Sequence, residues 1–342
     1  MLKKKLFVNA SNCHQGGGKT LLNAFLKGLS NEIEVVIYVD DRFEVEEQLP
    51  ASATVIKVNR IKRIFVGYKI KKTAEKTDKI FYFGNLPPFL RFKSEDVSLL
   101  LSNRFYVDTF SMKNFGIRDT VKIYLERFYY RIFIKNVSHV IVQTSSMYEK
   151  LRENGFNKNI SIWALDDLGK NSDLSKKVCT KEPASFIYVA SLLPYKNHKR
   201  LLMAWKLLKI QNINPKLYLT IDGDNSLREW IENIIAKNNL NVILLNKISR
   251  QELMEIYSKV ETLIYPSLFE AYGLPLIEAK KHKMKVLTAD LDYCWNFIEP
   301  DDFFNPYDIK SIERAVKRSL KVEVQLDRIY TPKEFFNNLI DL

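Results

Sequence analysis

The sequence has few cysteines and no long apolar run. Its 342 residues include 3 cysteines, Cys13, Cys179 and Cys294, which are too few and too scattered for a disulfide framework or a zinc site. The apolar runs, such as "VIYV" and "TLIY", are far shorter than the ~20 residues of a membrane-spanning helix. The start, "MLKKKLFVNASN", lacks the apolar stretch of a signal peptide. We therefore expect a cytoplasmic protein.

Glycine and proline are also sparse, at 11 each, and no segment is low in complexity or repeats at the period of a solenoid. With 46% hydrophobic and 27% charged residues, the composition is globular, and 342 residues are enough for two domains.

Charge is distributed unevenly along the chain. The formal net charge is +13. Residues 1–165 carry 27 Lys and Arg against 16 Asp and Glu, whereas residues 166–342 carry 26 against 24. The N-terminal half is therefore expected to meet something anionic, such as an acidic membrane surface, a phosphorylated lipid or nucleic acid. No nucleic-acid recognition motif accompanies the charge, so nucleic acid is kept only as an alternative.

Strand-like and helix-like segments alternate through the chain, which predicts α/β architecture with parallel sheets. "KLFVNA" (5–10) and "EVVIYVD" (34–40) are predicted strands, and "TLLNAFLKGLS" (20–30) is a predicted helix. The pattern lapses over 166–183, a polar stretch that contains glycine and proline and is predicted to be a linker. The alternation resumes at 184. The sequence thus predicts two doubly wound domains, 1–165 and 184–325, facing each other across a ligand cleft.

The segment "NASNCHQGGGKTLL" resembles the end of a phosphate-binding P-loop, with Gly18 followed by Lys19 and Thr20. A Walker A motif needs a further glycine where this chain has Cys13, so a P-loop NTPase is a minority alternative. A mobile turn is the plainest alternative. The interpretation we favour is that Gly16, Gly17 and Gly18 give a phosphate or sugar access to backbone N–H groups at a helix start.

The segment "YPSLFEAYGLPLIEA" is the more informative one. It holds Glu270 and Glu278, separated by seven residues, around a turn that contains Gly273. Pro275 suits the first turn of a helix, which places Glu270 in the preceding loop and Glu278 one turn inside. The loop amides can bind phosphate or sugar hydroxyls, and the carboxylates can accept hydrogen bonds from hydroxyls. Acidic residues that merely cap a helix are the structural alternative.

With these residues the chain resembles the retaining family-4 glycosyltransferases, which have the GT-B fold. "E-AYGLPLI-E" looks like their Glu, seven residues, Glu signature, and "YVASLLPYKNHKRLLMAW" and "LYLTIDGDN" are similar to family segments in the same order. The resemblance implies two Rossmann-like domains and a C-terminal helix, 326–342, that crosses back to the first domain. It also implies a bacterial surface-polysaccharide enzyme of the O-antigen or capsule type.

The resemblance implies roles for individual residues. Glu270 would contact the hydroxyls of the donor sugar, Lys196 would neutralise the diphosphate, and Glu278 would bind the ribose. Gly16, Gly17 and Gly18 would face the donor and acceptor. The remaining donor-binding residues that it implies are Ala271, Tyr272, Gly273, Leu274, Ser191, Asp222, Gly223, Asn246 and Ile248.

Two positions depart from the family. Many members have an Arg after the strand at the place of Ala190-Ser191, and a His at the place of Asn103-Arg104. We expect Asn103 to replace the hydrogen bonds of the His as a catalytic residue, and Arg104 to supply the missing cation near the phosphate.

The family further implies a UDP- or GDP-linked sugar donor, front-face transfer with retention, and no obligatory metal or other cofactor. The expected acceptor is a lipid-diphosphate-linked oligosaccharide at the inner leaflet of the cytoplasmic membrane. Stripes of Tyr, Phe and Ile at helical spacing are usually core, which is the first expectation for the basic aromatic segments 59–76 and 120–135. Their interleaved Lys and Arg also suit contact with that anionic surface, which is kept as the alternative. A phosphorylase-like or non-catalytic protein of the same fold is a further alternative.

Overall fold

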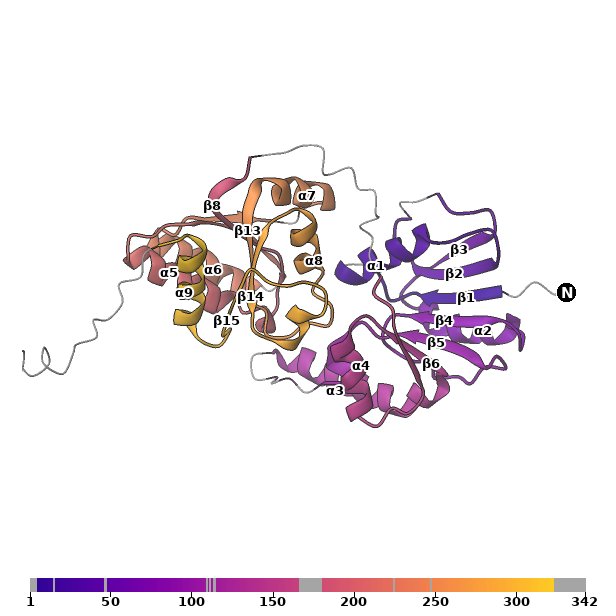
Figure 1. The fold of residues 1–342 in the computed structure, drawn as a ribbon. Coiled ribbons are helices and arrows are strands. Elements are labelled where there is room, and N and C mark those ends of the chain that lie inside the picture. The colour runs from indigo at the N-terminus through magenta and orange to yellow at the C-terminus, as the bar shows by residue number, and fades with distance from the viewer. Residues whose placement is uncertain are drawn as a thin grey trace, which may run out of the picture.

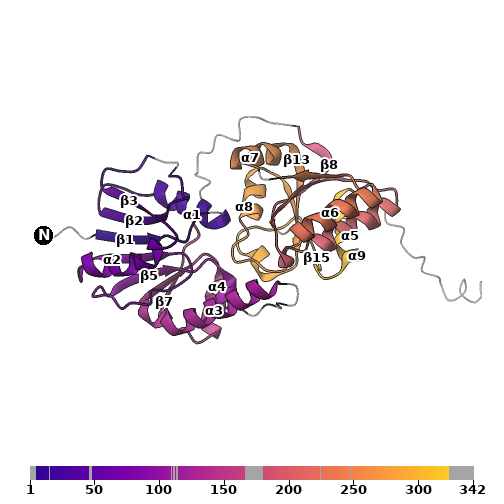
Figure 2. The ribbon, with the colours of Figure 1, turned by 180° about the vertical axis from the view of Figure 1, so that it is seen from behind.

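The computed structural model describes residues 5–14, 16–45, 48–108, 110, 112, 115–165, 180–223, 225–246 and 248–322. These residues form two parallel sheets that lie side by side, one from each half of the chain, with helices on both faces of each sheet (Figure 1, Figure 2). The expected α/β class with two doubly wound halves is confirmed. The domain limits themselves stay predictions.

The first sheet has the strand order β3-β2-β1-β4-β5-β6-β7, and each pair of neighbours is parallel. The order reverses between β1 and β4, as in other doubly wound sheets. Its strands are β1 (Lys5–Ala10), β2 (Glu34–Asp40), β3 (Ala53–Val58), β4 (Lys79–Phe83), β5 (Asp96–Leu100), β6 (His139–Val142) and β7 (Asn159–Ile162). Its helices are α1 (Gly16–Lys27), α2 (Val66–Thr73), α3 (Ile117–Phe133) and α4 (Ser145–Glu153).

The second sheet has the order β12-β10-β8-β13-β14-β15, again with parallel neighbours. Its strands are β8 (Glu182–Tyr188), β10 (Lys216–Thr220), β12 (Val242–Leu245), β13 (Val260–Tyr265), β14 (Lys285–Ala289) and β15 (Asp302–Phe304). Its helices are α5 (His198–Ile210), α6 (Asn225–Asn238), α7 (Arg250–Lys259), α8 (Leu274–Lys281) and α9 (Ile309–Ser319). β9 (Ser191–Leu192) and β11 (Asp222–Gly223) form a small two-stranded parallel sheet. In the sequence, β9 follows β8 and β11 follows β10.

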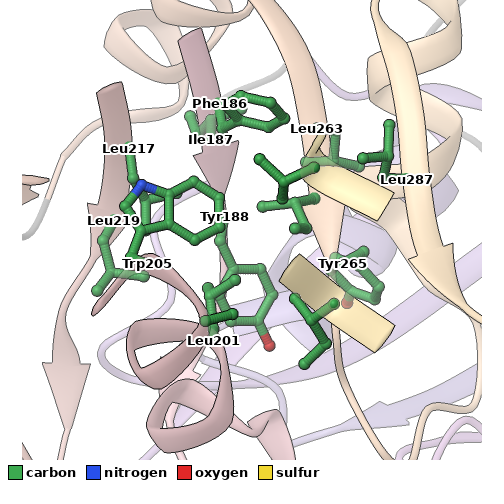
Figure 3. Packing of buried hydrophobic residues seen from close by; sticks show 14 of the residues in the cluster. Phe186, Ile187, Tyr188, Leu201, Trp205, Leu217, Leu219, Leu263, Tyr265 and Leu287 are labelled. Atoms are coloured by element: carbon green, nitrogen blue, oxygen red, sulfur yellow. The ribbon is translucent and has the colours of Figure 1, made fainter. Parts of the chain in front are cut away.

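Apolar strands suit this architecture because helices cover both faces of each sheet. In the second half, strand and helix side chains form one buried cluster (Figure 3). The rings of Phe186 and Trp205 lie 5.5 Å apart at 84°, an edge-to-face arrangement. Trp205 Nε1 donates a hydrogen bond to the main-chain oxygen of Pro215 at 3.0 Å, so burial of the indole leaves no unsatisfied donor.

Several element limits differ from the expectation. β8 begins at Glu182, inside the segment predicted as linker, and β15 and α9 extend the fold where no element was predicted. Most of that linker, 166–179, and the expected crossing helix, 326–342, lie outside the described residues.

The carboxyl edges of the two sheets meet. Thr144, which follows β6, donates from Oγ1 to the main-chain oxygen of Ala271, which lies beyond β13, at 3.2 Å. Its neighbour Ser145 donates from Oγ to Oδ1 of Asn296 at 2.9 Å. Loops at the carboxyl ends of strands carry the ligand sites of doubly wound folds, and here two such edges are in contact.

Candidate active site

The carboxyl edge of the second sheet brings Lys196 and Glu270 together. Lys196 ends the short 3₁₀ turn η5 (Pro194–Lys196), and Glu270 lies in the loop after β13. Lys196 Nζ donates to Glu270 Oε1, and each side chain is 12% exposed. Two side chains 74 residues apart in the sequence therefore form one partly buried ion pair.

Two buried tyrosines donate hydrogen bonds to the residues of this pair. Tyr265, the last residue of β13, donates from its hydroxyl to Glu270 Oε1 at 2.8 Å. Tyr188, the last residue of β8, donates to the main-chain oxygen of Lys196 at 2.6 Å. Burial, and then the charge of Glu270, raise the pKa of Tyr265 well above its usual value. The phenol therefore stays protonated and remains a hydrogen-bond donor to the carboxylate.

Asn197 joins the two loops that carry the pair. It has a left-handed backbone (φ 62°), which asparagine adopts more readily than most residues. Its Nδ2 donates to the main-chain oxygens of Pro266 at 3.0 Å and Pro306 at 2.8 Å. The amide of Leu268 also donates to the main-chain oxygen of Tyr195 at 2.8 Å. The relative position of Lys196 and Glu270 is thus fixed by main-chain contacts as well as by their own ion pair.

Helix α8 begins next to this pair, where it was predicted. Gly273 precedes it with φ +74°, and a Cβ at Gly273 would lie 3.0 Å from Cδ1 of Leu276. Pro275 sits in the first turn, where no intrahelical N–H partner is needed. The backbone of Ala271, Tyr272, Gly273 and Leu274 thus forms the approach to a helix N-terminus, which attracts anionic groups.

Glu278 lies one turn inside α8 and is only 3% exposed. Its Oε1 pairs with Arg250 Nη1 at 3.0 Å, and its Oε2 accepts from the hydroxyl of Tyr257 at 3.3 Å. Arg250 opens α7, so the carboxylate links α7 to α8.

The other expected donor-binding residues lie on loops that leave the same sheet. Ser191 and Asp222 are paired across β9 and β11. Gly223 has φ +131°, and a Cβ there would lie 3.3 Å from the amide nitrogen of Leu192, so this close approach requires glycine. Beyond β12, Asn246 Oδ1 accepts from Arg228 Nη2 at 3.0 Å, and Ile248 is half-buried in the following turn.

The glycine segment of the first half differs from its expected form. Gly16, Gly17 and Gly18 form the first turn of α1 instead of a loop before Thr20, so the predicted helix start is wrong. The chain turns earlier, where the amide of Cys13 donates to the main-chain oxygen of Ala10 at 3.0 Å. A Cβ on Gly16 or Gly17 would meet nothing within 4 Å, so the helix start is open there.

Cys13, which stands where a Walker motif has its first glycine, is a buried residue. It is 8% exposed, and its thiol donates to the main-chain oxygen of Phe83 at 3.1 Å. Burial raises the pKa of the Cys13 thiol to about 12. The described residues of this turn, 11–14 and 16–20, show no feature that favours P-loop chemistry.

Asn103 and Arg104 follow β5 at the carboxyl edge of the first sheet. Asn103 caps the turn η2 (Arg104–Tyr106) by accepting from the amide of Phe105 at 3.0 Å. Arg104 pairs with Asp108 and with Asp292 of the second half. The catalytic role of Asn103 and the phosphate role of Arg104 stay predictions.

The described residues include neither a metal-binding cluster nor a membrane-spanning helix. No group of three or more His, Cys, Asp or Glu side chains in the described part of the chain could hold a metal ion. None of the helices among those same residues combines the length and apolar character needed to cross a membrane.

Comparison with known proteins bears on the half that carries this site. Residues 170–332 match the family model of glycosyl transferases group 1. The matched residues are those of the half that carries this site. The group 1 match includes Lys196, Glu270 and Glu278, the three side chains that the sequence singled out in this half.

A curated relative extends the likeness beyond residues 170–332. The chain is 25% identical over 226 residues to the O-antigen chain mannosyltransferase RfbU of Salmonella typhimurium. That alignment covers 64% of this chain and 61% of RfbU, so the chain spans less than two thirds of the relative.

Solved structures match both halves at once. Sucrose-phosphate synthase from Thermosynechococcus elongatus superposes with a TM-score of 0.67 at 15% identity, over 94% of this chain and 90% of that one. Anabaena Alr3699/HepE in complex with UDP and glucose superposes with a TM-score of 0.62 at 14% identity, over the same shares. These likenesses show the fold, and the predicted GT-B architecture is confirmed.

The residues that hold the Lys196–Glu270 pair and Glu278 in place were not predicted from the sequence. No role was predicted for Tyr265 or Tyr188, although a tyrosine at the carboxyl end of a buried strand can donate into the adjoining loop. Arg250, Tyr257 and Asp292 carried no such signal, because their partners lie on other elements.

Proposed function

We propose that this protein is a glycosyltransferase that moves a sugar from a nucleoside diphosphate sugar to a hydroxyl of a glycan acceptor. The Lys196–Glu270 pair beside the start of α8 carries the proposal. Negative charge develops on the diphosphate as its bond to the sugar breaks. An ammonium group and helix N-terminal N–H groups stabilise such charge best when they are already in place.

In this proposal the donor runs along the carboxyl edge of the second sheet. Glu270 accepts hydrogen bonds from hydroxyls of the sugar, and Glu278 accepts them from the ribose. The base lies against the turn of Asn246 and Ile248, close in sequence to the end of β12. We propose UDP or GDP as the nucleotide, supported by the UDP and glucose named for HepE and the mannosyl transfer named for RfbU.

We propose transfer with retention of anomeric configuration and without an obligatory metal. The oxygen of the departing phosphate takes the proton of the attacking hydroxyl on the same face of the sugar. Lys196 and the start of α8 supply positive charge to that phosphate. Asn103 and the open glycines Gly16 and Gly17 contact the acceptor or donor from the opposite domain.

The proposed acceptor is a lipid-diphosphate-linked oligosaccharide in bacterial surface polysaccharide synthesis, at the cytoplasmic side of the membrane. The name of RfbU, an O-antigen chain mannosyltransferase, supports this pathway class. The surplus of positive charge in residues 1–165 supports an acceptor with a diphosphate and a membrane with anionic lipids.

A membrane-facing surface is also proposed, on η1 (Lys62–Phe65) and α3. Large apolar side chains are exposed there, among them Ile64 at 61%, Leu125 at 63% and Phe128 at 65%. Basic residues lie beside them in sequence, namely Lys62, Arg63, Lys69, Arg118, Lys122 and Arg131. Exposed apolar side chains with a surrounding positive charge suit an anionic bilayer surface.

The two parts of this surface are joined through one loop. Tyr68 of α2, which continues η1, packs against Phe89 with ring centroids 5.4 Å apart. Tyr129 of α3 donates to the main-chain oxygen of Pro87 at 3.1 Å. Because α2 and α3 flank the same loop, their exposed side chains can meet one bilayer together.

Donor binding tests the proposed activity. A thermal-shift screen over UDP- and GDP-sugars should identify a cognate donor, because a ligand at 100 times its Kd adds about 2.7 kcal/mol to stability.

Lys196→Ala and Glu270→Gln should abolish transfer in a radiolabelled-sugar assay. The matched controls are Lys285→Ala and Glu261→Gln, because these residues form a Lys–Glu pair (2.8 Å) at the amino end of the same sheet. A shift with ATP or GTP alone, or equal loss in the controls, would reject the proposal.

Vesicle flotation tests the membrane surface. Leu125→Ser with Phe128→Ser should reduce binding to vesicles of phosphatidylglycerol and phosphatidylethanolamine, and about 0.5 M salt should weaken it, since the Debye length falls to about 3–5 Å. Ile210→Ser is the control, because Ile210 is equally exposed (67%) but ends α5 in the other half. Equal binding of wild type and the double variant would refute this surface.

A further inference from the structure

Arg104 reaches from the first half of the chain into the second and meets the loop that carries Glu270. Its side chain is 9% exposed. Nη1 and Nη2 bind both carboxylate oxygens of Asp292 at 2.8 and 2.7 Å. Nη1 also lies 3.4 Å from the main-chain oxygen of Glu270, and the guanidinium lies 5.1 Å from the ring centroid of Phe269.

Asp108, a residue of the first half, also binds this guanidinium. Nε and Nη2 of Arg104 bind Oδ2 of Asp108 at 2.7 and 2.6 Å. The backbone is fixed as well, because Asn103 caps the turn and its amide donates to Oδ1 of Asn85 at 2.8 Å. Burial opposes the charge of Arg104, but hydrogen bonds to Asp292 and Asp108 outweigh it and raise the Arg104 pKa above its usual value.

Phe105, which follows Arg104, contacts the residues that precede Glu270 and Lys196. Its ring lies 4.7 Å from that of Phe269 and 5.3 Å from that of Tyr195. Phe269 directly precedes Glu270, and Tyr195 directly precedes Lys196. One dipeptide of the first half thus touches the chain next to both members of the ion pair.

We propose that Arg104 is a positioning residue that couples docking of the two halves to the placement of Glu270. This rests on the proposed function of the Lys196–Glu270 pair. When the halves dock, Arg104 binds Asp292 and the main chain of Glu270, and Phe105 covers Phe269. When they separate, these contacts break together, and the Glu270 loop loses its outer support. Glu270 is then aligned for transfer only in the docked arrangement.

This role differs from direct contact of Arg104 with the donor diphosphate. The guanidinium is shared between two carboxylates, and its bidentate partner Asp292 belongs to the half that carries the donor site. A bidentate Arg–carboxylate pair is strong and has one geometry, so it defines the docked position as well as stabilising it.

Asp292→Asn is the most informative variant, because Asp292 is 43% exposed and the Arg104–Asp108 pair stays intact without it. We expect kcat to fall about 10- to 100-fold, since misplacement of about 1 Å can cost 100-fold. The Kd for the nucleotide sugar should change less than about twofold. Arg104→Met should give the same split, Arg104→Lys a smaller loss, and the double variant Asp292→Asn with Arg104→Met no further loss.

Arg318→Met is the matched control, because Arg318 makes an equally close bidentate pair with Asp302 (2.8 and 3.0 Å) inside one half. It should leave kcat unchanged. Small-angle scattering adds a readout that needs no activity: Asp292→Asn should increase the radius of gyration of the free protein, and Arg318→Met should not.

The outcomes separate the hypotheses. A weaker Kd in Arg104→Met, with Asp292→Asn normal, would show that Arg104 contacts the donor and would overturn the positioning role. An unchanged kcat and radius of gyration in Asp292→Asn would overturn it as well. If the wild type binds no nucleotide sugar, the proposed function fails, while the scattering result still decides whether Arg104 docks the two halves.

Discussion

Gly273 offers a test of how tightly the start of α8 is constrained. Its φ of +74° is unfavourable for any residue with a Cβ, by about 1–2 kcal/mol. An added methyl group would also lie 3.0 Å from Cδ1 of Leu276, so that side chain or the first turn of α8 must move. Gly273→Ala should therefore lose stability and also disturb the proposed phosphate contact.

Gly155 separates these two effects. It has nearly the same φ, +77°, and a Cβ there would meet nothing within 4 Å. Gly155→Ala should lose only the backbone term, about 1–2 kcal/mol. For domains of 150–250 residues this lowers Tm by about 2–8 °C.

The assay is thermal unfolding with and without the cognate nucleotide sugar. At 100 times the Kd the donor adds about 2.7 kcal/mol, and a tenfold weaker affinity reduces this to about 1.4 kcal/mol. Gly273→Ala should therefore show about half of the donor-induced shift, and Gly155→Ala the full shift. Identical unfolding and identical donor response in the two variants would refute the reasoning about the start of α8.

Three other predictions follow from buried groups. Tyr265→Phe should lower kcat at least about tenfold in the transfer assay by removing a hydrogen bond to Glu270, worth about 1.5–3 kcal/mol for a charged acceptor; unchanged kcat would contradict this. Cys13 and Cys294, whose thiol pKa values burial raises to about 12 and about 11, should resist iodoacetamide at pH 8 in the folded protein and react after unfolding, as mass spectrometry can show. Burial, and then the charge of Lys196, lower the pKa of His198 to about 3. Since unfolded His198 binds a proton below about pH 6.5 and the folded one does not, stability should fall by about 1.4 kcal/mol per unit as pH drops from 6.5 towards 3; urea unfolding of His198→Phe should show a shallower slope, and an equal slope would contradict the assignment.

The elements with a clear hydrophobic pattern were predicted well. The strands Lys5–Ala10 and Glu34–Asp40 have the limits read from the sequence, because short apolar runs bounded by turn residues identify buried strands. The placement of Glu270 before α8 and Glu278 within it also followed from local rules for helix starts. Helix α9 was not predicted, although Ile312, Ala315 and Val316 repeat at helical spacing, so that signal was present and overlooked.

The contacts between distant residues could not be predicted from the sequence. Arg104 and Asp292 lie 188 positions apart, and nothing local to either residue indicates the other. The expectation for Arg104 used its charge alone, whereas its place in the fold depends on how two sheets dock. The start of α1 was wrong for a local reason: glycine disfavours a helix, so the three glycines were expected to form a loop, yet α1 begins at Gly16.

The amide of Asn197 limits which amino acids this position can accept. Glycine could adopt the left-handed backbone but would donate nothing to Pro266 and Pro306. Aspartate has the same length but would replace the donating Nδ2 with a carboxylate oxygen, which can only accept, against both carbonyl oxygens. A longer amide would need room at a site that is only 4% exposed. In a saturation library selected for function, asparagine should therefore be nearly the only survivor at this position.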